Sequence, residues 1–136
     1  MPSRNGRTTS TRPTTVFDPG AIVRVPFPFV ERNYRRVRPA LVITSKTFTE
    51  RTGLVWTLMI TSMARERWPD DVPIADHERS GLPIASMVRV AKIATIEARD
   101  LSVIGRIDSE TLASVHSKIK DSLLRRSDRT AASPRT

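Results

Sequence analysis

Arginines and hydroxyl groups are the side chains of this chain that are best placed to do chemistry. Five arginines fall at the ends of expected strands or in the loop that joins two of them: Arg24, Arg35, Arg36, Arg38 and Arg89. A planar guanidinium can hold a phosphate through two parallel hydrogen bonds. For each arginine taken alone, a structural salt bridge or a solvated side chain remains the alternative interpretation.

Several other chemistries have no residues to support them. The chain has no cysteine, which excludes disulfides, thiolate metal sites and thiol nucleophiles. Its two histidines, His77 and His116, are far apart, so the sequence predicts no metal site and no cofactor. It also lacks a glycine-rich phosphate loop and a nucleophile elbow. His77 lies in a loop among carboxylates and stays open as a proton-transfer residue.

Positive charge is concentrated at the two ends of the chain. The 136 residues carry 23 Lys and Arg against 14 Asp and Glu, a net charge of +9 that favours a polyanionic partner. Residues 1–16 hold three arginines and no acid, and residues 125–136 hold four arginines and one aspartate. Neither segment has the apolar residues to bury a core. We therefore expect two disordered basic arms around one domain over residues 17–124.

No sequence feature indicates a membrane or an export signal. No apolar run approaches the roughly 20 residues that a membrane-spanning helix needs. The N-terminal arginines are not followed by the apolar segment of a signal peptide. We therefore expect a cytoplasmic protein without membrane contact.

Hydrophobic patterns predict five or six short strands followed by one helix. Strands are expected at 21–25, 40–44, 54–61, 72–74, 86–96 and 101–107, with a turn at 50–53. The run 54–61 is almost continuously apolar, as in a strand buried on both faces. From Asp108 the period becomes helical, with Asp108 or Ser109 as N-cap and one apolar stripe of Leu112, Val115, Ile119 and Leu123. The expected fold is mainly β, a small and partly open barrel closed by a C-terminal helix.

Five short motifs, in order, resemble the PemK/MazF family of toxins from toxin–antitoxin systems. They are Gly20-Ala21-Ile22-Val23 leading into Val25-Pro26-Phe27-Pro28-Phe29, Arg38-Pro39-Ala40-Leu41-Val42, Ile60-Thr61-Ser62, Gly81-Leu82 with Ser86-Met87-Val88-Arg89 and Lys92-Ile93, and Ile104-Gly105-Arg106-Ile107. The resemblance covers residues 20 to about 124. It implies an SH3-like β-barrel with a C-terminal helix that works as a homodimer and cuts single-stranded RNA without metal.

The resemblance also implies a catalytic pair. In that family the arginine of the Arg-Pro-Ala motif and the threonine that ends the following long strand are catalytic, and these fall on Arg38 and Thr61. RNA supplies its own nucleophile, the 2′-hydroxyl, so the protein has to move protons and stabilise the charge on phosphorus. The products would be a 2′,3′-cyclic phosphate and a 5′-hydroxyl. Glu31 is the candidate base, with an ion pair to Arg35 or Arg36 as the alternative.

Two features of the family are missing here. Ala21 follows Gly20 where many members have an aspartate, and Ala91 stands where some members have the acid of an Arg-x-Asp motif. A mechanism that needs the later aspartate is therefore in doubt, which favours Arg38 with Thr61. Arg89 remains a candidate to bind the RNA backbone.

The other expected RNA contacts come from a loop and a strand end. Tyr34, Arg35 and Arg36 are placed to stack on unpaired bases or to contact their edges, with an exposed loop that contacts no base as the alternative. Ser62 can donate a hydrogen bond to a phosphate oxygen, as Thr61 can. For Trp68 and Pro69, in the next long loop, packing at the dimer edge is the alternative to a role in RNA specificity.

The resemblance implies one more partner, a small cognate antitoxin whose acidic or apolar segment would occupy the RNA groove. Two other functions stay open. One is a gyrase poison resembling CcdB, which shares the fold but does not cut RNA, and the presence of Arg38 and Thr61 argues against it. The other is a nucleic-acid-binding barrel without catalytic activity.

Overall fold

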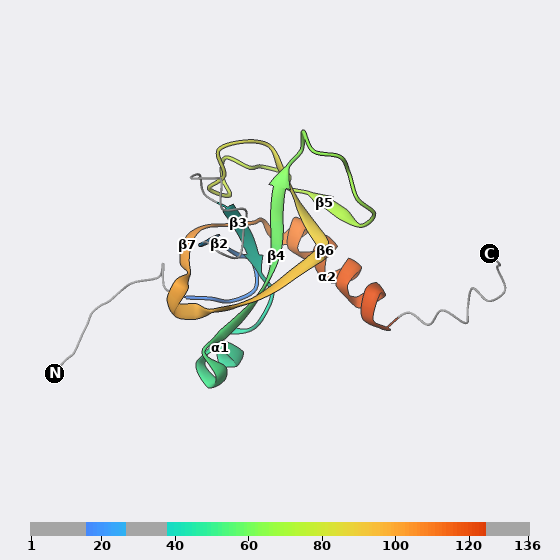
Figure 1. The fold of residues 1–136 in the computed structure, drawn as a ribbon. Coiled ribbons are helices and arrows are strands. Elements are labelled where there is room, and N and C mark those ends of the chain that lie inside the picture. The colour runs from blue at the N-terminus through green and yellow to red at the C-terminus, as the bar shows by residue number, and fades with distance from the viewer. Residues whose placement is uncertain (1–15, 27–37, 125–136) are drawn as a thin grey trace.

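The computed structural model of the chain describes residues 16–26 and 38–124. In these ranges, six antiparallel strands form one curled sheet in the order β5-β6-β4-β3-β2-β7 (Figure 1). The strands are β2 Ala21–Val25, β3 Arg38–Val42, β4 Leu54–Ser62, β5 Asp71–Pro73, β6 Ser86–Glu97 and β7 Ser102–Arg106. The helical segments of the described residues are α1 Lys46–Thr52, the short 3-10 helix η2 Ala98–Asp100, and α2 Ser109–Leu124. The predicted fold class, mainly β with a C-terminal helix, is confirmed.

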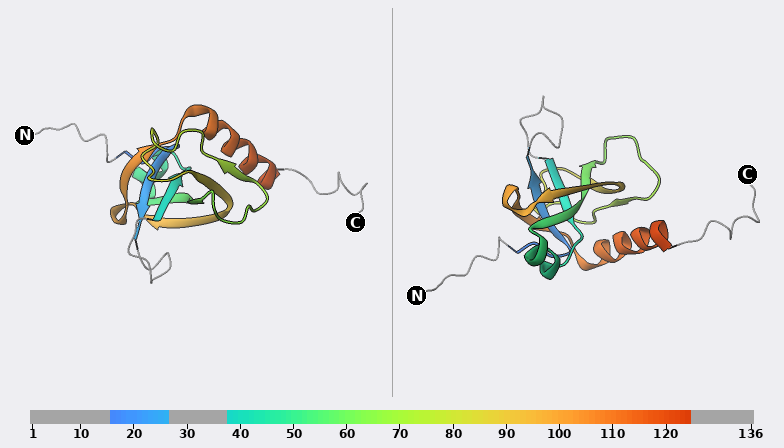
Figure 2. Two further views of the ribbon diagram at one scale, coloured as in Figure 1. Left: turned by 90° about the horizontal axis from the view of Figure 1, so that it is seen from above. Right: turned by 60° about the horizontal axis from the view of Figure 1, so that its bottom comes forward.

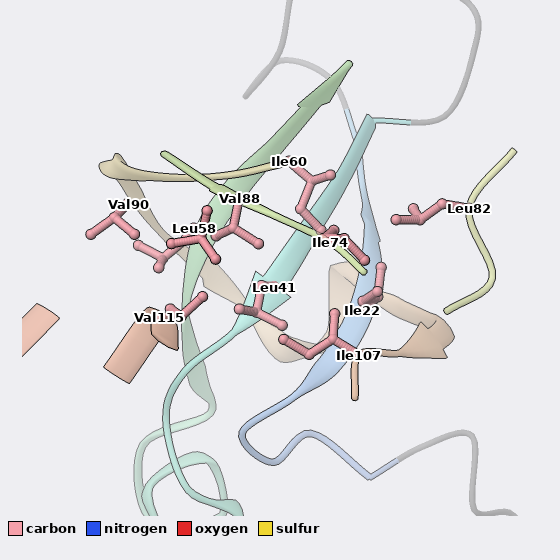
Figure 3. Packing of buried hydrophobic residues seen from close by; sticks show 11 residues of the cluster. Ile22, Leu41, Leu58, Ile60, Ile74, Leu82, Val88, Val90, Ile107 and Val115 are labelled. Carbon is pink, nitrogen blue, oxygen red and sulfur yellow. The ribbon is translucent and has the colours of Figure 1, made fainter. Parts of the chain in front are cut away.

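Apolar side chains fill both faces of the sheet. The cluster on the helix face, which lies between the sheet and α2, contains Ile22, Leu41, Leu58, Ile60, Val72, Ile74, Leu82, Val88, Val90, Ile107 and Val115 (Figure 3). The cluster on the opposite face contains Ala21, Val23, Val25, Ala40, Val42, Val55, Ile96 and Leu101. Side chains alternate along a strand, so sequence neighbours such as Ile22 and Val23 belong to different clusters. β4 contributes to both, as predicted for a strand buried on both sides.

A loop bridges the two edges of this open sheet. β5 and β7 are the edge strands of the described part, and the loop that follows β5 packs backbone against backbone on β7. A Cβ on Gly81 would collide with the carbonyl oxygen of Ile104, and a Cβ on Gly105 with that of Ser80. Only glycine allows two backbones to approach so closely. The loop thus covers the gap between the edges and gives the sheet its barrel form.

Helix α1 lies where the sequence predicted only a turn at 50–53. Its N-cap is Ser45, whose hydroxyl accepts a hydrogen bond from Phe48 N at 3.0 Å. It ends at Gly53, which adopts φ 76° and donates its N–H to the Thr49 carbonyl. Caps therefore define this short helix, which buries none of its residues and has no apolar stripe to reveal it.

Helix α2 begins as predicted. Asp108 caps it by accepting hydrogen bonds from Thr111 N at 2.9 Å and Thr111 Oγ1 at 2.7 Å. Val115 is fully buried, and Leu112 and Ile119 pack beside it. Leu123, predicted to continue this stripe, is exposed because the end of α2 extends past the sheet (Figure 2). None of the described helices is long and apolar enough to cross a membrane.

Candidate functional site

One row of residues crosses five strands at the end of β4. β2 pairs Val25 with Arg38, β6 pairs Met87 with Thr61, and β5 pairs Pro73 with Met87. The β3–β4 pairing sets Ala40 opposite Met59, and the same register extended by two residues sets Arg38 opposite Thr61. Opposed residues share a face of an antiparallel pair. Arg38 and Thr61 therefore lie on neighbouring strands, on the face opposite α2.

The predicted boundary of β3 was wrong by two residues, and the correction matters for the site. The strand runs from Arg38 to Val42 rather than from 40 to 44. Arg38 is thereby the first residue of a strand, fixed by its pairing with Val25, rather than a loop residue beside one. Pro39 is the second residue of this strand. Its missing N–H is tolerated because it falls where the ladder of hydrogen bonds begins.

The two polar residues of the row are next to each other in its middle, between buried apolar residues. Met87 and Val25 are buried, while Arg38 and Thr61 are partly exposed. Ser62 is the last residue of β4 and also partly exposed, and its Oγ accepts a hydrogen bond from Ala64 N at 3.0 Å. Alternation along β4 puts Ser62 on the face opposite Thr61. The structure therefore brings Thr61 into the row with Arg38 and places Ser62 on the other face of the sheet, at the end of β4.

Arg89, on β6, is held by protein groups. It is 8% exposed, and its Nε and Nη2 donate to the Asp71 carboxylate at 3.0 to 3.3 Å. Nη2 also donates to the Glu66 carbonyl at 2.7 Å, and the guanidinium lies 4.0 Å from the centre of the Trp68 ring. Asp71, at 4% exposed, pairs with Arg89 directly across β5 and β6. This arginine therefore ties the loop after β4 to the sheet.

A tight turn positions Trp68 above Arg89. Asp71 N donates to the Trp68 carbonyl at 3.2 Å, and Trp68 N donates to Asp71 Oδ2 at 2.8 Å. Pro69 occupies the second position of this turn and Asp70, with φ 71°, the third, which is the pattern of a type II turn. Lys118 of α2 lies 3.7 Å from the Asp70 carboxylate. The loop is thus fixed at both the sheet and the helix.

A large bulge in β6 lies next to these residues. Two steps along β4, from Leu58 to Ile60, correspond to five along β6, from Ile93 to Val88. The extra residues bend β6 just beyond Arg89, as bulges do near functional sites. Ala91, at the position where some family members have an acid, is exposed in this bulge.

Half of the predicted site lies outside the described residues. This half consists of Glu31, Tyr34, Arg35 and Arg36, whose predicted roles stay predictions. His77 is partly buried in the loop after β5 and is not part of the row. Across residues 16–26 and 38–124, no three His, Cys, Asp or Glu side chains gather in a way that could hold a metal ion.

The sequence analysis missed the partners of Arg89. The sequence-based predictions gave Asp71 no role and considered Trp68 for the dimer edge. The contacts depend on the register between β5 and β6, which no local pattern reveals. The one available signal was the Trp-Pro-Asp-Asp run, which is typical of a turn.

Comparison with known proteins agrees with this architecture. The model of the PemK-like, MazF-like toxin of type II toxin–antitoxin systems matches residues 18–123. No curated protein matches the chain. Among solved structures, MazE–MazF (Form-II) from Deinococcus radiodurans has a TM-score of 0.64 at 24% identity, covering 80% of this chain and 96% of that one.

Two further structures show the same fold. MazF (Form-I) from Deinococcus radiodurans has a TM-score of 0.63 at 25% identity, over 79% of this chain and 96% of that one. An endoribonuclease in complex with its cognate antitoxin, from mycobacterial species, has a TM-score of 0.60 at 16% identity, over 79% and 93%. Since the family model spans more than three quarters of the sequence, this chain belongs to the PemK-like, MazF-like toxin family of type II toxin–antitoxin systems.

Proposed function

We propose that the protein is an endoribonuclease toxin that cuts single-stranded RNA at short specific sequences without a metal ion. One observation carries the proposal: Arg38 and Thr61 come from neighbouring strands and share one face at one end of the sheet. A fixed cation and a hydroxyl on neighbouring strands, flanked by buried apolar residues, are suited to stabilise charge that develops on a phosphate.

The reaction is an internal transfer of the phosphodiester. The ribose 2′-hydroxyl loses its proton, and its oxygen bonds to the adjacent phosphorus while the bond from phosphorus to the 5′-oxygen breaks. The leaving oxygen takes up a proton, so the products are a 2′,3′-cyclic phosphate and a 5′-hydroxyl. Arg38 balances the added charge on the phosphate oxygens, and the Thr61 hydroxyl donates a hydrogen bond to one of them. Glu31 is the proposed base that accepts the first proton.

The remaining predicted residues bind the substrate in this proposal. Tyr34, Arg35 and Arg36 contact bases, and Ser62 binds the RNA at the end of β4, outside the row. Arg89 acts mainly by holding the loop after β4 in place. Asp71 already balances its charge, and its Nε and Nη2 already donate to protein oxygens.

The proposal includes a homodimer and an antitoxin. MazE–MazF and the mycobacterial complex are structures of toxins with antitoxins, which supports a cognate antitoxin for this chain. An acidic antitoxin segment over Arg38 would compete with RNA for the same cation. Adding such an antitoxin to the cleavage assay is expected to stop the reaction.

The test is incubation of the purified protein with a long single-stranded RNA in a metal chelator, followed by mapping of the product ends. Cyclic phosphate and 5′-hydroxyl ends at a recurring sequence are the expected result. Arg38→Ala should abolish cutting, and Thr61→Val should slow it by about a hundredfold or more. Thr61→Ser keeps the hydroxyl and should retain most of the activity.

Arg99→Ala is the matched control, since Arg99 is an exposed arginine just beyond the far end of β6 and pairs only with Glu97 among the described residues. It should cut as the wild type does. Cutting retained by Arg38→Ala would remove Arg38 from the mechanism. Intact RNA with inhibited gyrase would favour the gyrase poison instead, and RNA binding without cutting would favour a non-catalytic barrel.

A further inference from the structure

The stack of Trp68 on Arg89 is built more rigidly than a solvent-exposed loop requires. We infer that the uncovered face of Trp68 is a binding site for one nucleobase of the RNA, a choice of ligand that rests on the proposed function. Trp68 stacks on Arg89, which shares a face of the sheet with Thr61, so the bound base would belong to a nucleotide near the phosphate that is cut.

The first support is the preformed position of the ring. Arg89 lies 4.0 Å from the ring centre and covers one face, yet 39% of Trp68 remains exposed. Since Arg89 covers one face of the ring, we assign the accessible part of the side chain to the second face and the ring edges. Backbone hydrogen bonds to Asp71 fix the residue from both its N–H and its carbonyl. A ring held in this way loses little conformational entropy when a ligand stacks on it.

The second support is the distance from the proposed catalytic row. Thr61 pairs with Met87, and Arg89 is two residues further along the same face of β6. Such diagonal neighbours across an antiparallel pair lie about 7–8 Å apart. Arg89, on which the Trp68 ring stacks, is therefore a diagonal neighbour of Thr61 on the same face of the sheet.

The third support is the chemistry of single-stranded RNA. Its bases are unpaired, and aromatic rings bind them by stacking, which every base permits. The Asp71 carboxylate balances the Arg89 charge beneath the ring, so the stack adds a flat apolar surface rather than another phosphate contact. A base is the part of RNA that such a surface fits.

The chain contains its own control for this site. Of its two tryptophans, Trp56 is 43% exposed, close to the value for Trp68. Trp56 lies on β4 two residues before Leu58, on the helix face, and its ring meets Phe48 edge-to-face at 5.4 Å. It is equally accessible but on the wrong face for the proposed row.

The experiment uses Trp56→Phe, in which Trp68 is the only tryptophan. Titration with short oligoadenylate, oligocytidylate and oligouridylate should quench its fluorescence. In the otherwise natural protein, Trp68→Leu should weaken the affinity for these RNAs by about tenfold, while Trp68→Phe, which keeps an aromatic ring, should stay close to the wild type. Trp56→Leu should bind as the wild type does.

A second measurement holds even if Trp68→Leu loosens the loop. In a series of RNAs, a single abasic nucleotide is placed at each position in turn. The wild type should bind one member of the series more weakly than the others, whereas Trp68→Leu should bind all of them alike. Absence of quenching together with equal affinities of Trp68→Leu and the wild type would overturn the inference. Cutting of long RNA by Trp56→Phe is scored separately, so cutting without quenching refutes only the stacking site, and quenching without cutting refutes only the nuclease.

Discussion

Arg89 and Asp71 form a buried ion pair whose main effect is on position. Taking both charges out of water costs several kcal/mol, and their attraction and hydrogen bonds offset this cost. The pair therefore adds little net stability compared with apolar side chains of the same size. It does fix where the loop after β4 lies, because the Glu66 carbonyl and the Trp68 ring both rest on the guanidinium.

Removing one partner of this pair should be costly. Asp71→Ala leaves the Arg89 charge buried without its carboxylate and also removes the acceptor for Trp68 N. We expect the free energy of unfolding, measured by urea denaturation, to fall by about 3–5 kcal/mol. Glu97→Ala breaks the exposed pair with Arg99 and should cost less than about 1 kcal/mol. Equal losses in the two variants would contradict the structural role of the pair.

Arg38 and Thr61 became candidate site residues through the resemblance to PemK/MazF toxins, and their catalytic role stays a prediction. What the structure adds is their place on neighbouring strands and one face. The contacts of Arg89 could not be predicted from the sequence, since its carboxylate partner is on another strand and meets it only through the pairing of β5 with β6. Cross-strand register depends on the whole sheet, and its partners are not encoded in neighbouring residues.

Among the elements, α2 has the clearest electrostatic signature. The Asp108 carboxylate accepts two hydrogen bonds from Thr111, and these lower the pKa of Asp108 below its ordinary value of 3.8. The unfolded chain therefore binds this proton at a higher pH than the folded protein does. The carboxylate's contribution to stability is complete above the ordinary pKa and is lost as the pH falls through the lowered one.

Substitution of Asp108 should show this pH dependence directly. Asp108→Ala should lose about 1 kcal/mol of unfolding free energy at neutral pH. That difference from the wild type should shrink as the pH falls through the lowered pKa, measured by urea denaturation at a series of pH values. Asp108→Asn also caps the helix but does not titrate, so its free energy of unfolding should remain above that of Asp108→Ala at low pH. If the difference in unfolding free energy between the wild type and Asp108→Ala did not change with pH, the capping role of the carboxylate would be contradicted.

Element types were predicted best where an apolar pattern was long. The strand at β4 and the helix α2 follow directly from their periodicity. α1 was missed because seven residues with no buried face leave no pattern, only the caps Ser45 and Gly53. The start of β3 was placed after Arg38 because a charged residue before a proline is typical of the entry to a strand, although Arg38 pairs with Val25.

At the scale of the whole molecule, the charge and the proposed site are separate. Residues 17–124 keep only +3 of the net +9, since each terminal segment contributes +3. Composition could therefore indicate a polyanionic partner but not where it binds. The proposed site depends instead on a few side chains that the sheet order places together.

This separation predicts distinct roles for the terminal segments and the fold. Deleting residues 1–16 and 126–136 removes six arginines and one aspartate. Each phosphate that these arginines no longer neutralise should reduce the slope of log affinity against log salt by roughly 0.7 for single-stranded RNA. Affinity is measured by fluorescence anisotropy with RNA that carries a 2′-deoxy nucleotide at the cut site. Because Arg38 and Thr61 remain, the deletion variant should still cut at the same sequence.

A full-length variant with the same six arginines changed to glutamine keeps the chain length and removes only the charge. It should match the deletion in salt dependence, because the effect comes from released counterions rather than from chain length. An unchanged slope in both variants would mean that the terminal arginines do not bind RNA. Loss of cutting in the glutamine variant would instead assign part of the catalytic site to the terminal segments. It would contradict the claim that the terminal charge and the catalytic site act separately.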